Sequence, residues 1–505
     1  MAGVLASVLA PGSVQADPNN NNSEKLRRAV TLEGVRRHQA VFQQLATSAG
    51  GNRFAGLAGH DASAAYVASQ LRSAGYAVTF HEFTYDAFFE RTPSVLQQTS
   101  PTPTTYTNGL DFRIMSYSGT GAVTAPLARP TGDERGCSSS DFAGFPSGAI
   151  ALVLRGTPAG QPSCTFRIKT DNATAAGASA VLIYNNVPGV VNGTLGATGL
   201  SSIPSLGLTQ ALGQALAAAL GSGPVTMHVK TDTDSEVLTT RNVLAETRGG
   251  DPNNVVMVGA HLDSVAAGPG INDNGSGSAA ILETAIQMSK VKPRNTVRFA
   301  WWSAEESGLI GSTRYLESLP AAERDKIALY LNFDMVGSPN FVRFVYDGDN
   351  STGQGSVGPA GSESIEKLFV DYFNSVGLPS EPTPFNGRSD YGPFINRGIP
   401  SGGLFTGAEG VKTPAQAATY GGVAGQSYDP CYHAACDTYA NNSDTAIDQM
   451  SDAIAHSVIT YAQNSEAING VKGKGNLRTQ PGNAGPGTGL GGGGGLHDGH
   501  EDEAA

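Results

Sequence analysis

Apolar residues in the second half of the chain form short runs that alternate with stretches of helical spacing. Runs at 255–260, 296–303 and 327–333 predict buried strands, because strands covered on both faces carry apolar residues at nearly every position. Helical spacing predicts a helix over about 276–290 and another after Ser307. Strands that alternate with helices in this way are typical of an α/β fold with a mostly parallel sheet.

The first hundred residues and the last helical stretch fit the same fold. Helical spacing over 24–47 and 63–74 precedes a strand-like segment at 77–80. Alanines and aliphatic residues at helical spacing over 448–463 predict a closing helix. Between these parts, from about Ser116, the chain changes to short strands and Gly/Pro turns, which indicates a separate β-rich domain inserted into the α/β domain.

The two ends of the chain differ in composition from the rest. Met1–Ala16 is apolar and ends in small residues, as a cleaved secretory signal does, although it lacks a basic start; an ordinary Ala/Gly-rich terminus is the alternative. The run of glycines beyond Gly470 predicts a tail without a fold. The expected segments are a signal remnant and linker at 1–22, the first part of the α/β domain at 23–115, the insertion at 116–235, the second part at 236–465, and a disordered tail at 466–505.

Charge and hydropathy exclude several classes of partner. The 505 residues carry a formal net charge of −12, and the pI near 5.2 argues against nucleic-acid binding, which needs a basic surface. The sequence contains no apolar run long enough to span a bilayer, so we expect no membrane partner. A soluble, monomeric protein is the expectation.

The four cysteines fall into two local pairs. Cys431 and Cys436 lie five residues apart around His433, and Cys137 and Cys164 share one earlier segment. Two local disulfides are the simplest pairing, with free buried thiols as the alternative. Together with the signal remnant, they predict a secreted, extracellular protein.

Candidate metal ligands of the two kinds that zinc prefers, imidazole and carboxylate, recur where apolar runs end. In an open parallel sheet, ligands gather beyond the carboxyl ends of the strands. The candidates are His261, Asp273, Glu306, Asp334 and His433. Each of these alone would be a turn, a cap or a solvated side chain; their joint occurrence predicts a metal centre.

The number and types of these ligands suit two Zn²⁺ ions. Asp273 follows a Gly-rich turn and opens a helix, which makes it the natural carboxylate to bridge both ions. His261 with Asp334 would complete one site, and Glu306 with His433 the other. Neighbouring extended residues point in opposite directions, so Glu305 is left to act as a general base.

Three further side chains have predicted roles around the centre. Asp263 lies two residues after His261, on the same side of an extended strand, and could fix the tautomer of that imidazole. Tyr432 could donate to an oxyanion, or simply fill the loop between the two cysteines. Arg388 sits in a polar loop and could anchor a carboxylate or carbonyl.

At this point the chain resembles the secreted zinc aminopeptidases of peptidase family M28, especially the actinobacterial type. The resemblance covers roughly 30–90 and 236–465. The blocks that carry it are Gly259-Ala-His-Leu-Asp-Ser264, Gly270-Ile-Asn-Asp-Asn-Gly-Ser-Gly277, Trp302-Ser-Ala-Glu-Glu-Ser-Gly-Leu-Ile-Gly-Ser312, Asn332-Phe-Asp-Met335, Gly387-Arg-Ser-Asp-Tyr-Gly-Pro-Phe394 and Cys431-Tyr-His433.

The resemblance implies a fold and a site. The fold would be that of zinc exopeptidases, a mixed, mostly parallel sheet flanked by helices. The same five zinc ligands are implied, with Glu305 as base, Tyr432 on the oxyanion, Arg388 in the substrate site and an apolar pocket along 402–406. In some relatives carboxylates matching Asp448 and Asp452 bind Ca²⁺ with a third acid, which Ala29-Val-Thr-Leu-Glu33 does not clearly match.

The inserted segment resembles a protease-associated (PA) domain. The similarity lies in Gly148-Ala-Ile-Ala-Leu-Val-Leu-Arg-Gly156, Cys164-Thr-Phe-Arg-Ile-Lys169 and Val181-Leu-Ile-Tyr-Asn-Asn186.

The predicted function is a di-zinc aminopeptidase that releases N-terminal, apolar residues from peptides with a free amine. A metal-bridged hydroxide would attack the scissile carbonyl while Glu305 moves the proton. A carboxypeptidase or a glutaminyl-cyclase-like enzyme on the same fold is the first alternative, since fold does not fix reaction. A non-enzymatic, receptor-like relative is the second.

Overall fold

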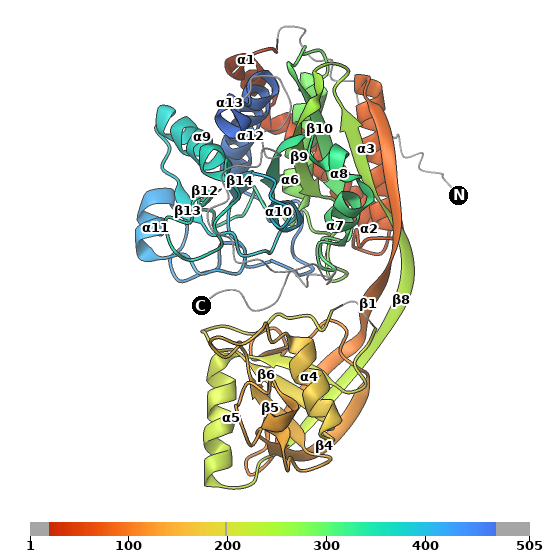
Figure 1. Cartoon of the computed structure of the whole chain (residues 1–505), viewed down its shortest axis with the longest axis vertical. Coiled ribbons are helices and arrows are strands. Elements are labelled where there is room, and N and C mark those ends of the chain that lie inside the picture. Colours follow the sequence, from red (N-terminus) through yellow and green to blue (C-terminus); the bar gives the residue numbers. More distant parts are fainter. Residues whose placement is uncertain (1–19, 197–198, 471–505) are drawn as a thin grey trace, which may run out of the picture. The chain divides into compact units, whose positions relative to one another are not determined.

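The computed structural model describes residues 20–196 and 199–470, which divide into two compact units (Figure 1). The first unit joins the residues up to Phe83 to those from Thr240 onward, and the second contains Thr84–Thr239. We expected an insertion at 116–235. The second unit begins earlier, at Thr84, which lies inside strand β1, Ala77–Ser100. The change of composition that we used to place the boundary comes only after this strand. The predicted signal remnant lies outside the described residues.

The sheet of the first unit is mixed and mostly parallel, as predicted. Its strand order is β13-β12-β14-β11-β9-β10-β8. The pairs β9/β10, β9/β11, β11/β14 and β12/β13 are parallel, whereas β8/β10 and β12/β14 are antiparallel. The strands are β8 Thr226–Glu246, β9 Asp251–His261, β10 Asn295–Trp302, β11 Ile327–Phe333, β12 Phe344–Tyr346, β13 Glu381–Thr383 and β14 Ser401–Phe405.

Helices cover both faces of this sheet. Alternate residues of β10 enter two cores: Phe299 and Trp301 pack among the larger helices, and Trp302 packs on the opposite face. The first core is covered by α1 Ser23–Ala29, α2 Leu32–Ser48, α3 Ala58–Ala74, α6 Gly275–Met288, α9 Ser362–Ser375 and α12 Asp444–Gln463. The second is covered by α7 Ile310–Ser318 and α10 Tyr391–Ile395. The shorter helices are α8 Ala321–Arg324, α11 Pro414–Tyr420 and α13 Glu466–Asn469.

The register of the central strands brings their carboxyl ends to one edge. Trp302 of β10 pairs with His261 of β9, and Asn332 of β11 pairs with Gly259 of β9. Residues that directly follow β9, β10 and β11 therefore come together beyond this edge, as expected for ligands in an open parallel sheet.

The second unit has hydrophobic cores of its own, and its strands continue the strand order beyond β8. Its strand order is β8-β4-β5-β6-β7-β3, with parallel pairing from β4 to β7. Two helices, α4 Phe166–Ala175 and α5 Gln210–Ser222, belong to this unit. The strands not yet bounded are β2 Thr104–Thr105, β3 Phe112–Ile114, β4 Gly121–Ala128, β5 Ile150–Leu154, β6 Ala180–Tyr184 and β7 Ser205–Leu208.

Two predicted elements differ from the structure. The single helix expected over 24–47 is two helices, because Thr31 is extended and its side chain caps α2 by accepting from the Gly34 N–H. The tail expected from 466 begins with α13 at Glu466–Asn469, so its first residues are helical. Within the described part of the chain, no helix is both long and apolar enough to cross a membrane.

Candidate metal centre

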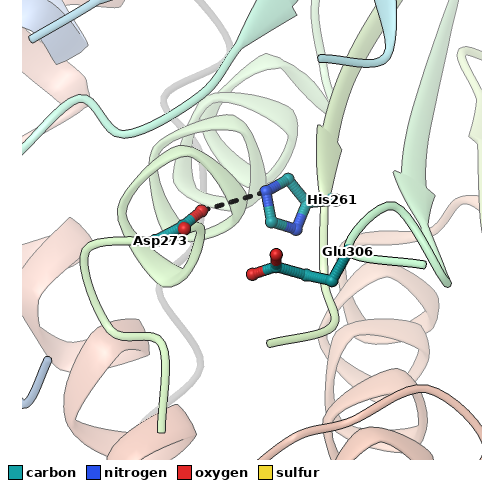
Figure 2. A group of neighbouring side chains, drawn as sticks. All are labelled: His261, Asp273 and Glu306. Atoms are coloured by element: carbon teal, nitrogen blue, oxygen red, sulfur yellow. Dashed lines mark ion pairs between the residues drawn. The ribbon is translucent and has the colours of Figure 1, made fainter. Parts of the chain in front are cut away.

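The predicted zinc ligands meet at the carboxyl edge of the sheet of the first unit. His261 ends β9, Asp334 follows β11, and Glu306 lies in the turn after β10. Figure 2 shows His261, Asp273 and Glu306 pointing toward a common space, with an ion pair between the first two. Together with Glu305 and Asp334, these residues form two groups whose ligand atoms lie within 4.8 Å of one another, and His261 belongs to both groups.

Asp273 contacts both imidazoles, which is the geometry required of a shared carboxylate. One of its oxygens lies 3.2 Å from Nε2 of His261, and the other lies 3.2 Å from Nε2 of His433. Nε2 of His261 is also 3.4 Å from Asp334, and Nε2 of His433 is 3.0 Å from Glu306. The structure thus brings all five candidates together in the pairing that the sequence suggested.

These side chains fit a bound cation, because two of their buried oxygens have no hydrogen-bond partner. Oε1 of Glu306 and Oδ1 of Asp334 are buried and accept no hydrogen bond. An ionised carboxylate oxygen in that condition is costly unless a positive charge faces it. Imidazole nitrogens together with carboxylate oxygens are the donor set that suits zinc.

Burial and neighbouring charges shift the pKa values of the cluster. Burial raises the pKa of Glu305 well above its ordinary value, against the opposing charge of His261. Burial likewise raises the pKa of Glu306. Burial lowers the pKa of His261, but the carboxylates of Glu305 and Asp334 outweigh it, and the net shift is well upward. Burial and the negative charge of the neighbouring acids therefore favour the protonated forms of His261, Glu305 and Glu306.

Comparison with known proteins agrees with this chemistry. Residues 242–458 match peptidase family M28, and residues 123–216 match the PA domain. An aminopeptidase of Pseudomonas aeruginosa (strain UCBPP-PA14) is 46% identical over 442 residues, which cover 85% of this chain and 81% of the relative. Leucine aminopeptidase 2 of Trichophyton equinum is 49% identical over 359 residues, 70% of this chain and 71% of that protein.

The chain belongs to peptidase family M28. Solved structures with the same fold include an aminopeptidase from Aneurinibacillus sp. strain AM-1, with a TM-score of 0.69 at 28% identity over 91% of this chain and 98% of that one. A zinc aminopeptidase from Bacillus subtilis has a TM-score of 0.57 at 26% identity, over 85% of this chain and 95% of its own.

Glu305 faces the His261 half of the candidate centre, and Glu306 faces the His433 half. Oε2 of Glu305 lies 3.8 Å from Nε2 of His261, a longer approach than that of Asp273 or Asp334. The backbone before Glu305 is unusual, because Ala304 has φ +56°. Met335, after Asp334, and His433 itself are also in the left-handed region, so strained backbone is concentrated around the M28 centre.

Asp263 supports the centre in a different way from the one predicted. Nδ1 of His261 lies 3.2 Å from the main-chain oxygen of Asp263 and 3.7 Å from its carboxylate. The carboxylate instead accepts hydrogen bonds from the N–H groups of Glu305 and Glu306 at 3.2 and 3.3 Å. The residue therefore orients the histidine through its carbonyl, and both glutamates through its side chain.

Several supporting residues were missed by the sequence argument. Arg53 is fully buried, and its guanidinium donates to the carbonyls of Leu262, Pro269 and Gly270 in the loop between the first two ligands. Nothing in the local sequence of Arg53 signals this role.

Two more missed residues hold the ligand segments directly. Asp437 accepts from the N–H groups of Asn272 and Asp273 at 2.8 and 3.0 Å. Oγ of Ser389 donates to Asp334 at 2.6 Å. The sequence did offer a signal for each of them. Asp437 directly follows Cys436, and Ser389 directly follows Arg388 in one of the blocks that carry the resemblance.

The expected disulfides are formed, and one of them frames the site. Cys431 pairs with Cys436 around His433, and Cys137 pairs with Cys164 in the PA unit. The ring of Tyr432 stacks on that of His433, with centroids 3.8 Å apart. The short disulfide loop thus carries both a predicted ligand and the predicted oxyanion donor.

A third group of acids, Asp347, Asp349 and Glu366, also gathers in the first unit. Both oxygens of Asp347 accept hydrogen bonds from Ser351 and Thr352 of its own loop. These contacts account for the buried carboxylate as a loop anchor.

Proposed function

We propose that this enzyme is a zinc-dependent aminopeptidase that removes N-terminal residues, preferentially apolar ones, from peptides with a free amine. The observation that carries the proposal is Asp273, whose two oxygens face two imidazoles that each have a further carboxylate beside them. A shared carboxylate between two half-sites is what a pair of metal ions requires.

In this proposal His261 and Asp334 would hold one Zn²⁺, His433 and Glu306 would hold the other, and Asp273 would contribute to both. Bound there, the ions would polarise the scissile carbonyl and lower the pKa of a water molecule. Glu305 accepts the proton of the attacking water and passes it to the leaving amine. Its buried carboxylate, whose pKa is raised by desolvation, suits a group that must accept a proton.

The same cluster accounts for the choice of a free N-terminus. The acids around the site offer negative charge to the ammonium group of an unblocked peptide. Tyr432 donates to the oxygen on which negative charge develops. The leucine aminopeptidases among the relatives of this chain support an apolar preference for the first side chain.

The carboxypeptidase alternative loses support from one contact. A carboxypeptidase would need a free basic group for the terminal carboxylate, and Arg388 was the candidate. Its guanidinium is already paired with Glu409 at 2.7 Å. An aminopeptidase does not need that charge free.

The test is hydrolysis of leucine p-nitroanilide by the purified protein, before and after a zinc chelator and again after zinc is restored. We expect activity to disappear and to return, and an amino-blocked twin of the substrate to be inert. Zinc-loaded protein without activity, or equal hydrolysis of the blocked twin, would refute the proposal.

Two further proposals concern the location of the enzyme and its binding of calcium. The disulfides support secretion, and we propose that the enzyme acts outside the cell as a monomer.

For calcium we propose at most weak binding at Asp448 and Asp452. These acids line a hollow with Arg27, whose Nη1 lies 3.3 Å from Asp452 and opposes a divalent cation. A calcium titration followed by the thermal midpoint, Tm, tests this, and a large rise at micromolar calcium would contradict it.

A further inference from the structure

Arg388 joins two side chains at the metal centre that the sequence argument did not connect. Its Nη1 lies 2.7 Å from Oε1 of Glu409, and its Nη2 lies 3.2 Å from the hydroxyl oxygen of Tyr432. Glu409 comes four residues after the end of β14, and Tyr432 comes directly before His433. The three groups form a line from the loop after β14 to the predicted ligand.

The direction of each hydrogen bond follows from the chemistry of the groups. A guanidinium can only donate, so the phenol oxygen of Tyr432 accepts from Arg388. The proton of the phenol is therefore left to be donated elsewhere. Because Tyr432 stacks on His433, its ring is held beside the centre while Arg388 occupies one side of the hydroxyl. A phenol that accepts from a cation is also a stronger donor, since linked hydrogen bonds polarise one another.

The loop that carries Glu409 is built against the segment before Tyr432. The Tyr428 N–H donates to the Gly410 carbonyl at 2.8 Å, and the Asp429 N–H donates to the Ala408 carbonyl at 2.9 Å. These two bonds flank Glu409 on either side. The backbone at Glu409 is thereby held, and its half-exposed carboxylate contacts one arm of the guanidinium fork while the other arm contacts Tyr432.

We propose that Glu409 is a positioning residue for catalysis: it holds Arg388 against the oxygen of Tyr432, so that the phenol presents its proton to the developing oxyanion. Glu409 itself touches neither substrate nor metal. The inference rests on the proposed aminopeptidase function and assigns Arg388 to the tyrosine rather than to a substrate carboxylate.

A double-mutant cycle tests this assignment, with kcat and KM for leucine p-nitroanilide measured separately on zinc-loaded protein. Glu409→Gln should lower kcat about tenfold with KM within about twofold, the size expected for loss of a supporting partner. In a Tyr432→Phe background, the same change should alter kcat by less than about twofold, because the phenol through which it acts is gone. Glu409→Asp, which keeps the charge, should recover part of the loss.

The control is Glu323→Gln, which removes a half-exposed acid from a surface pair with Lys326. It should leave kcat unchanged. The inference is overturned if Glu409→Gln matches the parent, or if it lowers kcat tenfold in the Tyr432→Phe background as well. If Tyr432→Phe keeps full activity, the proposed role of Glu409 through Arg388 and Tyr432 is overturned, while the aminopeptidase proposal stands. A parent protein without activity would instead refute the proposed function.

Discussion

Each unit of this chain buries charged side chains, but the two units satisfy them differently. In the described part of the PA unit, Lys169 is the only buried charged side chain. Its ammonium donates to the carbonyls of Gly156 and Arg135 at 2.7 and 3.1 Å and lies 3.2 Å from Sγ of Cys164. In the peptidase unit, Glu306 and Asp334 each keep a buried oxygen that accepts no hydrogen bond.

The difference separates a structural charge from a functional one. A buried charge is tolerated when hydrogen bonds replace the lost water, which is the condition of Lys169. Buried acids that each leave one oxygen without a hydrogen bond, gathered around two imidazoles, are tolerated when cations complete them. For these three residues, how completely the buried charge is hydrogen-bonded separates the structural lysine from the proposed metal ligands more clearly than burial alone does.

The largest expected effect tests the catalytic side of this comparison. Glu305→Gln keeps the shape of the side chain but removes the proton acceptor, so kcat should fall about a thousandfold. Zinc content should stay at the parental value, because Glu305 is not among the proposed ligands. Metal analysis and leucine p-nitroanilide kinetics measure both quantities. Activity near that of the parent would remove Glu305 from the mechanism.

The two disulfides should separate stability from activity. From the chain-entropy relation, Cys137→Ser with Cys164→Ser should cost about 3.5 kcal/mol for a separation of 27 residues, and the Cys431/Cys436 pair about 2 kcal/mol for a separation of 5. Denaturant unfolding measures these losses. Only the second pair should also lower kcat, since its loop carries Tyr432 and His433. Equal kcat losses for both pairs would contradict the division of roles.

Lys169→Met should destabilise the PA unit without touching catalysis. The carbonyls of Gly156 and Arg135 would lose the partner, at a cost of about 2 to 3 kcal/mol. Calorimetry should show a lower transition for this unit, while kcat per folded molecule stays constant. A changed kcat would mean that this buried charge has a functional role after all.

The smallest predicted effect concerns the pH dependence of the metal-free protein. Burial raises the pKa of Asp390 to about 7 and that of Asp437 to about 8, whereas unfolded aspartates titrate near pH 4. These two carboxyls hold more protons in the folded chain than in the unfolded chain between about pH 4 and 8, so their contribution to stability falls as the pH rises through that window. His60 and His456, whose pKa values burial lowers to about 4, act in the opposite direction below about pH 6.5. We expect the net result to be a drop in Tm of a few degrees between pH 5 and 8.

The matched variants for this prediction come from the two units. Asp390→Asn should flatten the pH slope, because it removes one of the buried acids. Asp171→Asn, which changes an exposed acid of the PA unit, should leave the slope unchanged. A metal-free Tm that is constant or rises over this range would show that the buried carboxyls ionise normally in the fold.

The local pattern of the sequence was sufficient for much of the fold. The run at 327–333 is a strand with those bounds, because a buried strand needs only an unbroken apolar run between turns. The break in the first helix at Thr31 and the full length of β1 were not predictable in this way. Exposed residues of β1 carry no apolar signal, and a capping threonine also occurs outside helix starts.

By itself, the sequence determined the candidate ligands and the two disulfide pairs, because strand-end position and local cysteine spacing can be read along the chain. Only the tertiary structure decided which groups support the ligands. Arg53 donates to carbonyls more than 200 residues away in sequence, and Glu409 reaches Tyr432 only through Arg388. Such contacts depend on how separate loops pack at one edge of the sheet, and no local periodicity encodes that packing.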